Sequence, residues 1–215
     1  MNALTTRRTL ILLFAPLFLQ GQMNQPVVII LLGPPGSGKS TQSEKITAEF
    51  GIPAVSTGAL LRAEVAAGTP LGKRIEGDMQ KGALISDDMV NDLVAERFNK
   101  PDAARGLILD GYPRTVEQAR FLDELLAKRQ SGNPLVLNLE VTKEEVLKRM
   151  ASRERADDRP EVIVERLAVY VKETRPLLDY YAARGVENIE ASGTVEAVFE
   201  KVRAILKDHS ARREH

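Results

Sequence analysis

Gly33–Ser40 reads GPPGSGKS, and this stretch decides which fold the chain is expected to adopt. An apolar run, Val27–Leu32, directly precedes it, and a segment with helical character, Thr41–Phe50, directly follows it. Strand, glycine-rich loop and helix in this order form the context in which G-x-x-x-x-G-K-[ST] indicates a phosphate-binding loop. Glycines let backbone N–H groups approach a polyphosphate, and the helix N-terminus adds a partial positive charge. The alternative is a glycine-rich turn that binds nothing. It requires the motif to occur by chance, and the probability of that in a chain of this length is on the order of a percent or less.

Three polar side chains predict that the bound group is a nucleotide with Mg²⁺. Lys39 supplies a mobile charge that can reach the outer phosphates, and Ser40 supplies a hydroxyl near the metal. Asp110 ends the apolar segment 106–111, where P-loop proteins keep an acid that faces Mg²⁺, commonly through water. Taken alone, Asp110 fits equally well as an acid that caps a turn at the end of a strand.

The composition of the chain excludes several classes of chemistry. Hydrophobic residues make up 43% and charged residues 28% of the 215, the balance of an ordinary soluble globular protein. Thirty basic and thirty acidic residues cancel, which does not favour a general nucleic-acid surface. The chain has no cysteine, so disulfides, thiolate zinc sites and cysteine nucleophiles are excluded. Its two histidines, His209 and His215, lie in the tail, so histidine acid–base chemistry is not expected.

Residues 1–22 differ from the rest of the chain. Arg7 and Arg8 precede an apolar run at 10–19, a pattern typical of a signal peptide and too short to span a bilayer, which needs about 20 residues. Alternatively, Met23 is the true start, and residues 1–22 are a mis-called start or a dispensable extension. We favour this second interpretation and expect a cytoplasmic protein, because nucleotide chemistry needs a compartment that holds nucleoside triphosphate. Export remains the alternative.

Strand-like and helix-like segments alternate along the rest of the chain. Beyond the first strand and helix, strands are expected at 52–55, 106–111, 135–141 and 186–190, and helices at 59–67, 71–81, 89–99, 117–129, 143–154, 161–183 and 194–207. Pro176 is expected to kink or divide the long helix, and the charged tail 208–215 is expected to fray. The alternation predicts an α/β fold with a parallel sheet of about five strands covered by helices on both faces. A ligand is expected at the carboxyl ends of these strands.

Six arginines lie at or beside the breaks between the expected elements. For any one of them, a solvated surface charge is the default interpretation. The planar guanidinium group, however, binds phosphate oxygens bidentately and keeps its charge. In phosphoryl transfer, a protein contributes position and charge neutralisation rather than covalent chemistry, and one lysine with several arginines can supply both. The six are Arg62, Arg114, Arg149, Arg153, Arg155 and Arg166.

Five motifs in order and spacing resemble the adenylate kinase family. They are GPPGSGKST at 33–41, STGALLR at 56–62, LDGYPRT at 109–115 with Gln118, the pair Arg149 and Arg153, and RADD at 155–158 with Arg166. The resemblance covers about residues 23–207. It implies a P-loop NTPase fold with a helical AMP-binding insertion at 56–85 and a short lid at about 154–161.

The resemblance also implies a set of site residues. ATP would be bound by Gly36, Ser37, Gly38, Lys39, Ser40, Thr41, Arg149, Arg153 and the main chain of Val195. AMP would be bound by Thr57, Arg62, Ala83, Leu84, Ile85, Gly111, Tyr112, Pro113, Arg114, Gln118, Arg155 and Arg166. The catalytic residues would be Lys39, Arg114, Arg149, Arg153, Arg155 and Arg166, and Asp157 and Asp158 would form hydrogen bonds in the closed lid. Mg²⁺ would be held by nucleotide phosphates and water near Ser40 and Asp110. No zinc is expected, because the lid is short and the chain lacks cysteine.

The expected reaction is Mg²⁺-dependent transfer of the γ-phosphoryl group of ATP to AMP, which yields two ADP. The Gln118 amide can donate and accept at once, which suits N1 and the amino group of adenine. The nearest alternative is a UMP/CMP kinase. The related pyrimidine nucleotide kinases usually carry SAG where this chain has STG at 56–58, so this position favours AMP. A non-catalytic nucleotide-binding protein is the second alternative. ATP, AMP and ADP are the expected partners, without nucleic acid or stable membrane association, and the resemblance implies a monomer.

Overall fold

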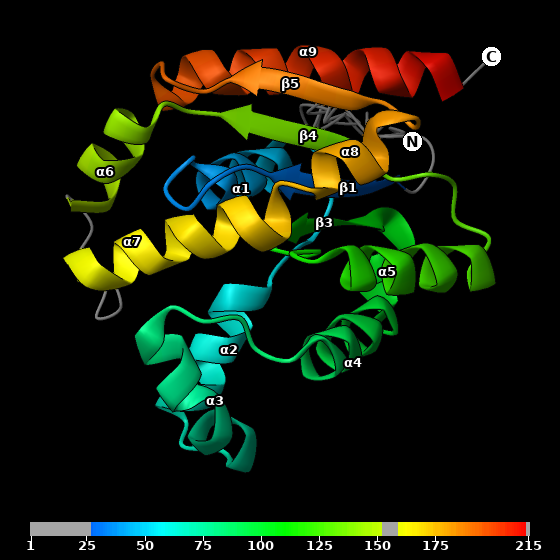
Figure 1. The fold of residues 1–215 in the computed structure, drawn as a ribbon. Helices are drawn as coiled ribbons and strands as arrows, with labels where there is room; N and C mark the ends of the chain where they lie inside the picture. Colours follow the sequence, from blue (N-terminus) through cyan, green and yellow to red (C-terminus); the bar gives the residue numbers. More distant parts are fainter. Residues whose placement is uncertain (1–26, 152–158, 214–215) are drawn as a thin grey trace, which may run out of the picture.

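A computed structural model describes residues 27–151 and 159–213. In these residues, five strands form one parallel sheet in the order β2-β3-β1-β4-β5, as Figure 1 shows. The strands are β1 (Val27–Leu32), β2 (Ala54–Ser56), β3 (Gly106–Asp110), β4 (Leu135–Glu140) and β5 (Val186–Glu190). This arrangement confirms the predicted α/β fold class.

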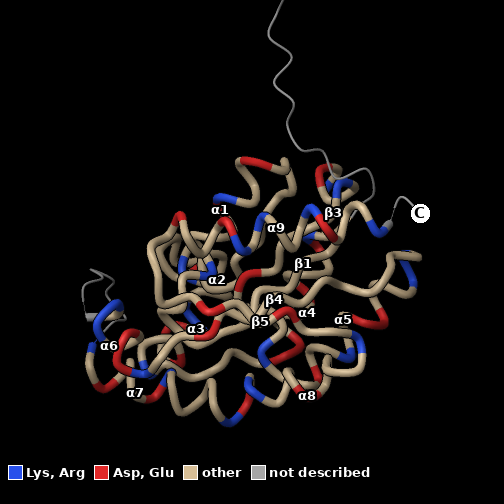
Figure 2. The backbone as a smooth tube through the Cα atoms, turned by 90° about the horizontal axis from the view of Figure 1, so that it is seen from above, with Lys and Arg blue, Asp and Glu red and all other residues tan. Residues whose placement is uncertain are grey.

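The helices cover both faces of this sheet. They are α1 (Lys39–Phe50), α2 (Thr57–Ala66), α3 (Pro70–Lys81), α4 (Asp87–Phe98), α5 (Val116–Lys128), α6 (Lys143–Ala151), α7 (Pro160–Val169), α8 (Leu177–Ala182) and α9 (Val195–Arg213). A 3₁₀ turn, Pro101–Arg105, precedes β3, and a π-helical turn, Tyr170–Thr174, connects α7 to α8. None of the described helices is both long and apolar enough to cross a membrane. Figure 2 shows basic and acidic residues interspersed along the chain, in line with the balanced composition.

The alternation of side chains along β1 creates two cores. Val28, Ile30 and Leu32 belong to a cluster that includes residues of α4, α5 and α8. Their neighbours Ile29 and Leu31 point to the opposite face and pack with residues of α1 and α9. Because both faces of the central strand are buried, its sequence is a continuous apolar run rather than an alternating one.

Local signals explain where several helices begin and end. Thr69 caps α3, because its Oγ1 accepts a hydrogen bond of 2.9 Å from the N–H of Gly72, and Gly82 ends that helix with φ of 76°. Thr115 caps α5 in the same way and accepts a hydrogen bond of 3.1 Å from the N–H of Gln118. As predicted, Pro176 divides the long helical segment, and it stands at the N-cap of α8.

The sequence-based prediction fails at the C-terminal end. The tail from Asp208 was expected to fray, but α9 continues to Arg213. Within this last stretch, Arg212 forms a 2.8 Å ion pair with Asp208 one helical turn away, which stabilises a terminal helix by a few tenths of a kcal/mol. The N-terminal extension 1–22 and most of the predicted lid lie outside the described residues.

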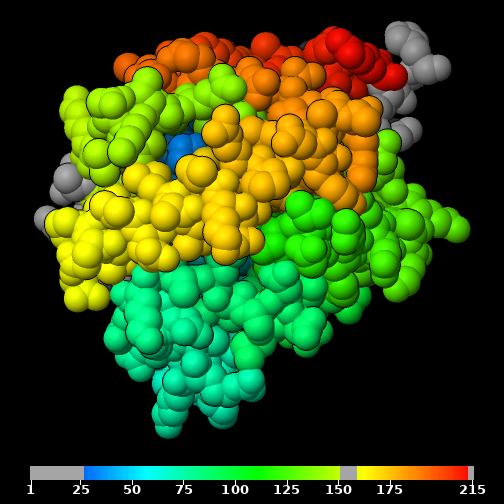
Figure 3. Space-filling model, viewed as in Figure 1, coloured from blue at the N-terminus to red at the C-terminus, as the bar shows by residue number. Residues whose placement is uncertain are grey.

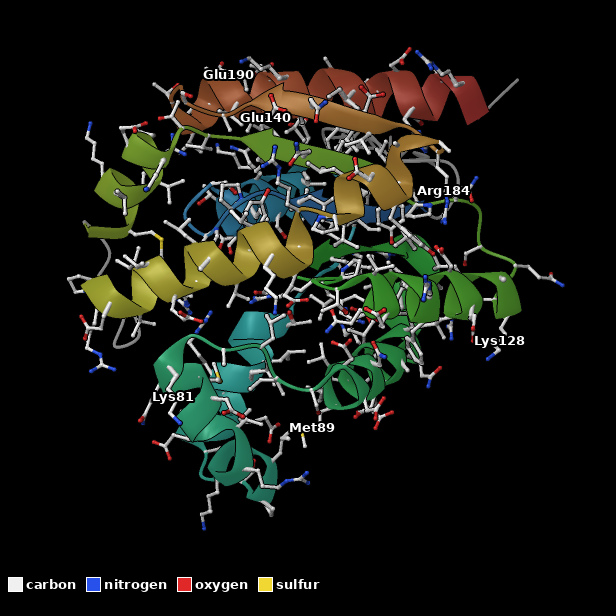
Figure 4. All side chains as sticks on the ribbon, viewed as in Figure 1. Lys81, Met89, Lys128, Glu140, Arg184 and Glu190 are labelled. Atoms are coloured by element: carbon white, nitrogen blue, oxygen red, sulfur yellow. The ribbon has the colours of Figure 1, made fainter. Side chains whose placement is uncertain are left out.

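The topology brings the loops after the strands to one edge of the sheet. Glu140 and Glu190, labelled in Figure 4, mark the carboxyl ends of the paired strands β4 and β5. The P-loop follows β1 at this edge, and Asp110 ends β3 beside it, paired in register with Leu31. Helices α2 and α3 project away from the sheet below this edge (Figure 1).

Candidate active site

The P-loop joins β1 to α1 through glycines in unusual backbone conformations. Gly38 stands at the N-cap of α1 with φ of 97°, in the left-handed region that other residues rarely adopt. A Cβ built on Gly38 would meet no atom within 4 Å, so the backbone conformation, and not crowding, requires glycine there. The space around it is open to a ligand that approaches the N-terminus of α1.

Lys39 folds back over the loop. Its Nζ donates hydrogen bonds to the carbonyl oxygens of Gly33 at 2.7 Å and Pro34 at 2.9 Å, and to Ser37 Oγ at 3.3 Å. The ammonium group therefore lies on the concave side of the loop, where the phosphates of a bound nucleotide would be. The same contacts join Lys39 to three residues of the loop.

Ser40 and Asp110, predicted to lie near Mg²⁺, are in direct contact. Ser40 Oγ donates a 2.6 Å hydrogen bond to Asp110 Oδ2, although the two residues are 70 positions apart. Mg²⁺ prefers hard oxygen ligands and is usually bound by one or two protein oxygens together with phosphate and water oxygens. A hydroxyl and a carboxylate beside the P-loop fit that description. No group of three or more acidic or histidine side chains that could hold a metal ion occurs in the described parts of the chain.

Three arginines meet on the other side of the P-loop. Arg114 Nε donates a 2.8 Å hydrogen bond to the carbonyl oxygen of Gly111. Guanidinium atoms of Arg62 and Arg114 both lie within 4 Å of the position that a Cβ on Gly58 would take. Burial and the neighbouring charge of Arg166 lower the pKa of Arg114, Arg62 adds to this, and Asp110 acts in the opposite direction. Three like charges held together in this way are chemically suited to an anion.

Arg166 reaches this cluster because α7 packs closely on the end of α3. Gly82, with φ of 76°, lies so near α7 that a Cβ there would be 3.1 Å from Cγ of Arg166 and 3.2 Å from Val162. A side chain at this position would need Val162 and Arg166 to shift slightly, and the left-handed φ itself favours glycine. The end of α3 and the Arg166 side chain are therefore close neighbours at the edge of the cleft.

A cleft of about 630 Å³ runs along this edge of the sheet. Figure 3 shows blue surface from the start of the described chain at the bottom of a hollow beside α6 and α7. The predicted residues that line the cleft are Gly36, Ser37, Gly38, Lys39, Ser40, Thr41, Arg62, Leu84, Gly111, Pro113, Arg114, Arg149, Arg166 and Val195. Most of the predicted ATP site is therefore brought together in one place.

A smaller cavity of about 50 Å³ opens between α2, α3 and α5. It is lined by four further predicted AMP contacts, Thr57, Ala83, Ile85 and Gln118. Arg62, Arg114 and Arg166 line both cavities, so the arginine cluster lies where the two meet.

Arg149 and Val195 mark the far end of the cleft. Arg149 donates to Glu145 Oε1 at 2.8 Å and to the carbonyl oxygen of Ala191 at 2.8 Å. The carbonyl oxygen of Val195 accepts a 3.1 Å hydrogen bond from Gln42 Nε2, which connects α1 to the start of α9. These contacts hold α6 and the loop before α9 beside the P-loop.

Two predicted AMP contacts have unexpected surroundings. Tyr112 is fully buried in the core, and its hydroxyl donates to Asn91 Oδ1 at 2.7 Å, so its side chain does not line either cavity. Burial and the charge of Asp87 raise the pKa of Tyr112. The Gln118 amide accepts a 2.7 Å hydrogen bond from the N–H of Arg114 and donates one of 2.7 Å to Asp87 Oδ1.

Asp87 was missed as a site residue. α4 begins at Asp87, where an acid is expected to interact with the N-terminus of its own helix. Asp87 instead accepts hydrogen bonds from Thr115 and Gln118, 28 and 31 positions away. No pattern in the sequence reveals contacts of that range. Four further predicted residues, Arg153, Arg155, Asp157 and Asp158, lie outside the described residues.

A P-loop with an acid on the adjacent strand, beside a second cavity lined by arginines, defines a P-loop nucleotide-binding protein. The adenylate kinase family model matches residues 31–186. The adenylate kinase of Mycobacterium tuberculosis is 46% identical over 180 residues, which cover 83% of this chain and 99% of that protein. The adenylate kinase of Mycolicibacterium smegmatis is 45% identical over 178 residues, 83% of this chain and 98% of that protein. The chain belongs to the adenylate kinase family, as the motifs predicted.

Proposed function

We propose that the protein catalyses transfer of the γ-phosphoryl group of ATP to AMP and the reverse reaction from two ADP, with Mg²⁺ as the metal. The observation that carries the proposal is the junction of two cavities at Arg62, Arg114 and Arg166, next to the P-loop. The larger cavity is lined by the P-loop and would hold the triphosphate. The smaller cavity is lined by Gln118, whose amide suits a base. The names of the relatives point to the same reaction.

On the donor side, the N–H groups of the P-loop and the N-terminus of α1 would bind the β- and γ-phosphates. Lys39 would exchange its contacts with Gly33 and Pro34 for contacts with phosphate oxygens. Ser40 and Asp110 would hold Mg²⁺, directly or through water, and the metal would screen the phosphate charge. Arg149 would lie beside the nucleotide, as would the main chain of Val195.

On the acceptor side, the arginine cluster would bind the phosphate of AMP and aim one of its oxygens at the γ-phosphorus. That oxygen is already anionic, so the attack needs no strong protein base. The protein would contribute alignment and charge neutralisation. Arg153, Arg155, Asp157 and Asp158 would complete the site from the short lid, which would exclude water as a competing nucleophile.

Two alternatives are separated from this proposal by a single assay. ADP formation is measured in a coupled assay with AMP, CMP or UMP as acceptor and ATP as donor. A preference for AMP supports the proposal, and a preference for CMP or UMP replaces it with a pyrimidine nucleotide kinase. ATP binding without ADP formation from any acceptor identifies a non-catalytic nucleotide-binding protein. We also propose a cytoplasmic monomer, which size-exclusion chromatography and cell fractionation would test.

A further inference from the structure

Asp87 lies behind the acceptor cavity and forms a closed ring of hydrogen bonds with α5. Its Oδ1 accepts from Gln118 Nε2 at 2.7 Å, and its Oδ2 accepts from Thr115 Oγ1 at 2.8 Å. The Thr115 hydroxyl in turn accepts from the N–H of Gln118 at 3.1 Å. Asp87 itself does not line the cavity, whereas Gln118 does.

Two partners fix which way the Gln118 amide faces. A carboxylate only accepts hydrogen bonds, so the group that faces Asp87 must be the NH₂ of the amide. A backbone N–H only donates, so the group that faces the N–H of Arg114, at 2.7 Å, must be the amide oxygen. A flipped amide would set its oxygen against the carboxylate and its NH₂ against the N–H. Since Gln118 is only 2% exposed, water would not compensate for these losses.

The fixed amide has one donor and one acceptor position left. Each amide has two hydrogens and two oxygen lone pairs, and the contacts with Asp87 and Arg114 use one of each. Adenine presents an acceptor at N1 beside a donor amino group. Hypoxanthine has nearly the same shape but presents the reverse, a donor at N1 beside an acceptor oxygen. A freely turning amide would suit both bases, whereas a fixed amide suits one of them.

We propose that Asp87 is a positioning residue for acceptor selectivity: by holding the NH₂ of Gln118, it excludes monophosphates whose base presents the reversed donor–acceptor pair. The proposal rests on the proposed AMP site and adds the reason why that site would reject inosine monophosphate. Asp87→Asn keeps the shape of the side chain but offers both a donor and an acceptor. The amide of Gln118 then loses one of the two partners that oppose a flip.

The test compares kcat/KM for AMP and for inosine monophosphate in the wild type, Asp87→Asn and Asp88→Asn. Asp88 is exposed, carries the same charge in the same first turn of α4, and serves as the matched control. We expect Asp87→Asn to lower the AMP-to-inosine-monophosphate ratio by roughly ten- to hundredfold, the selectivity range of a misplaced buried hydrogen bond. Asp88→Asn should leave the ratio at the wild-type value.

The outcomes distinguish a failure of the inference about Asp87 from a failure of the proposed function. A purely structural role for Asp87 would lower both kcat/KM values in proportion, and an unchanged ratio in folded Asp87→Asn overturns the inference. A wild-type protein that does not phosphorylate AMP overturns the proposed function instead. If Asp87→Asn fails to fold, the wild type alone decides: a fixed amide predicts a preference of at least roughly tenfold for AMP over inosine monophosphate. Equal kcat/KM values for the two acceptors in a wild type that phosphorylates AMP overturn the inference.

Discussion

Replacing Lys39 with methionine tests the assignment of the P-loop most directly. Methionine keeps an unbranched stem of similar length and removes the charge and the donors to Gly33, Pro34 and Ser37. Removing one donor that stabilises transition-state charge costs about 3–4 kcal/mol in known sites, and one tenfold step in rate corresponds to about 1.4 kcal/mol. We therefore expect kcat to fall roughly 10²- to 10³-fold in Lys39→Met.

The stability of Lys39→Met should change far less than its activity. Lys39 is partly exposed, and both Lys39 and its partner Gly33 line the cleft, where water can replace lost hydrogen bonds. We expect the free energy of unfolding to fall by about 1 kcal/mol or less.

The assay is coupled ADP formation at saturating ATP and AMP, alongside thermal denaturation followed by circular dichroism. Lys45→Met is the matched control: it lies on the same helix, pairs with Glu196 at 3.4 Å and covers the Phe199 ring outside the cleft. Near-normal turnover in Lys39→Met, or an equal loss in Lys45→Met, would refute the role assigned to the P-loop lysine.

Three further substitutions probe the metal, the acceptor phosphate and the core. Asp110→Asn should raise the Mg²⁺ concentration needed for half-maximal rate, measured by titration of the metal at fixed ATP, because the carboxylate beside the P-loop loses its charge. Arg114→Lys should raise KM for AMP by roughly tenfold or more and leave KM for ATP nearly unchanged, because lysine cannot bind phosphate bidentately; equal changes in both constants would contradict this. Tyr112→Phe leaves Asn91 Oδ1 without its 2.7 Å donor and should lower the free energy of unfolding by about 1–3 kcal/mol in urea denaturation. An unchanged midpoint would show that Asn91 finds another donor.

The strands and the P-loop were predictable from the sequence because their signals are local. Val27–Leu32 is apolar throughout, and the structure gives β1 those same limits. The helices expected at Thr41–Phe50 and 71–81 each stop directly before a glycine, and these glycines, Gly51 and Gly82, both adopt left-handed conformations. A glycine after an apolar or amphipathic segment acts within a few residues, so a short window of sequence contains the whole cause.

Contacts between distant elements were not predictable in the same way. Asp87 looks like an ordinary helix-start acid, and only the packing of α4 against α5 brings it to Thr115 and Gln118. Tyr112 stands in a motif of site residues, yet its side chain is fully buried in the core. Such outcomes depend on the fold as a whole, which a motif does not contain.

The arginine cluster makes the stability of this protein depend on its solvent. Folding gathers Arg62, Arg114 and Arg166 into a partly buried group, and burial, followed by the neighbouring charges, lowers the pKa of Arg114. A phosphate-bearing ligand that binds only the folded state adds about 2.7 kcal/mol of stability at a concentration 100 times its Kd. Melting temperatures measured in phosphate, in chloride and with nucleotide would therefore describe three different stabilities. In a cell, bound nucleotide would therefore raise the free energy of unfolding of this protein.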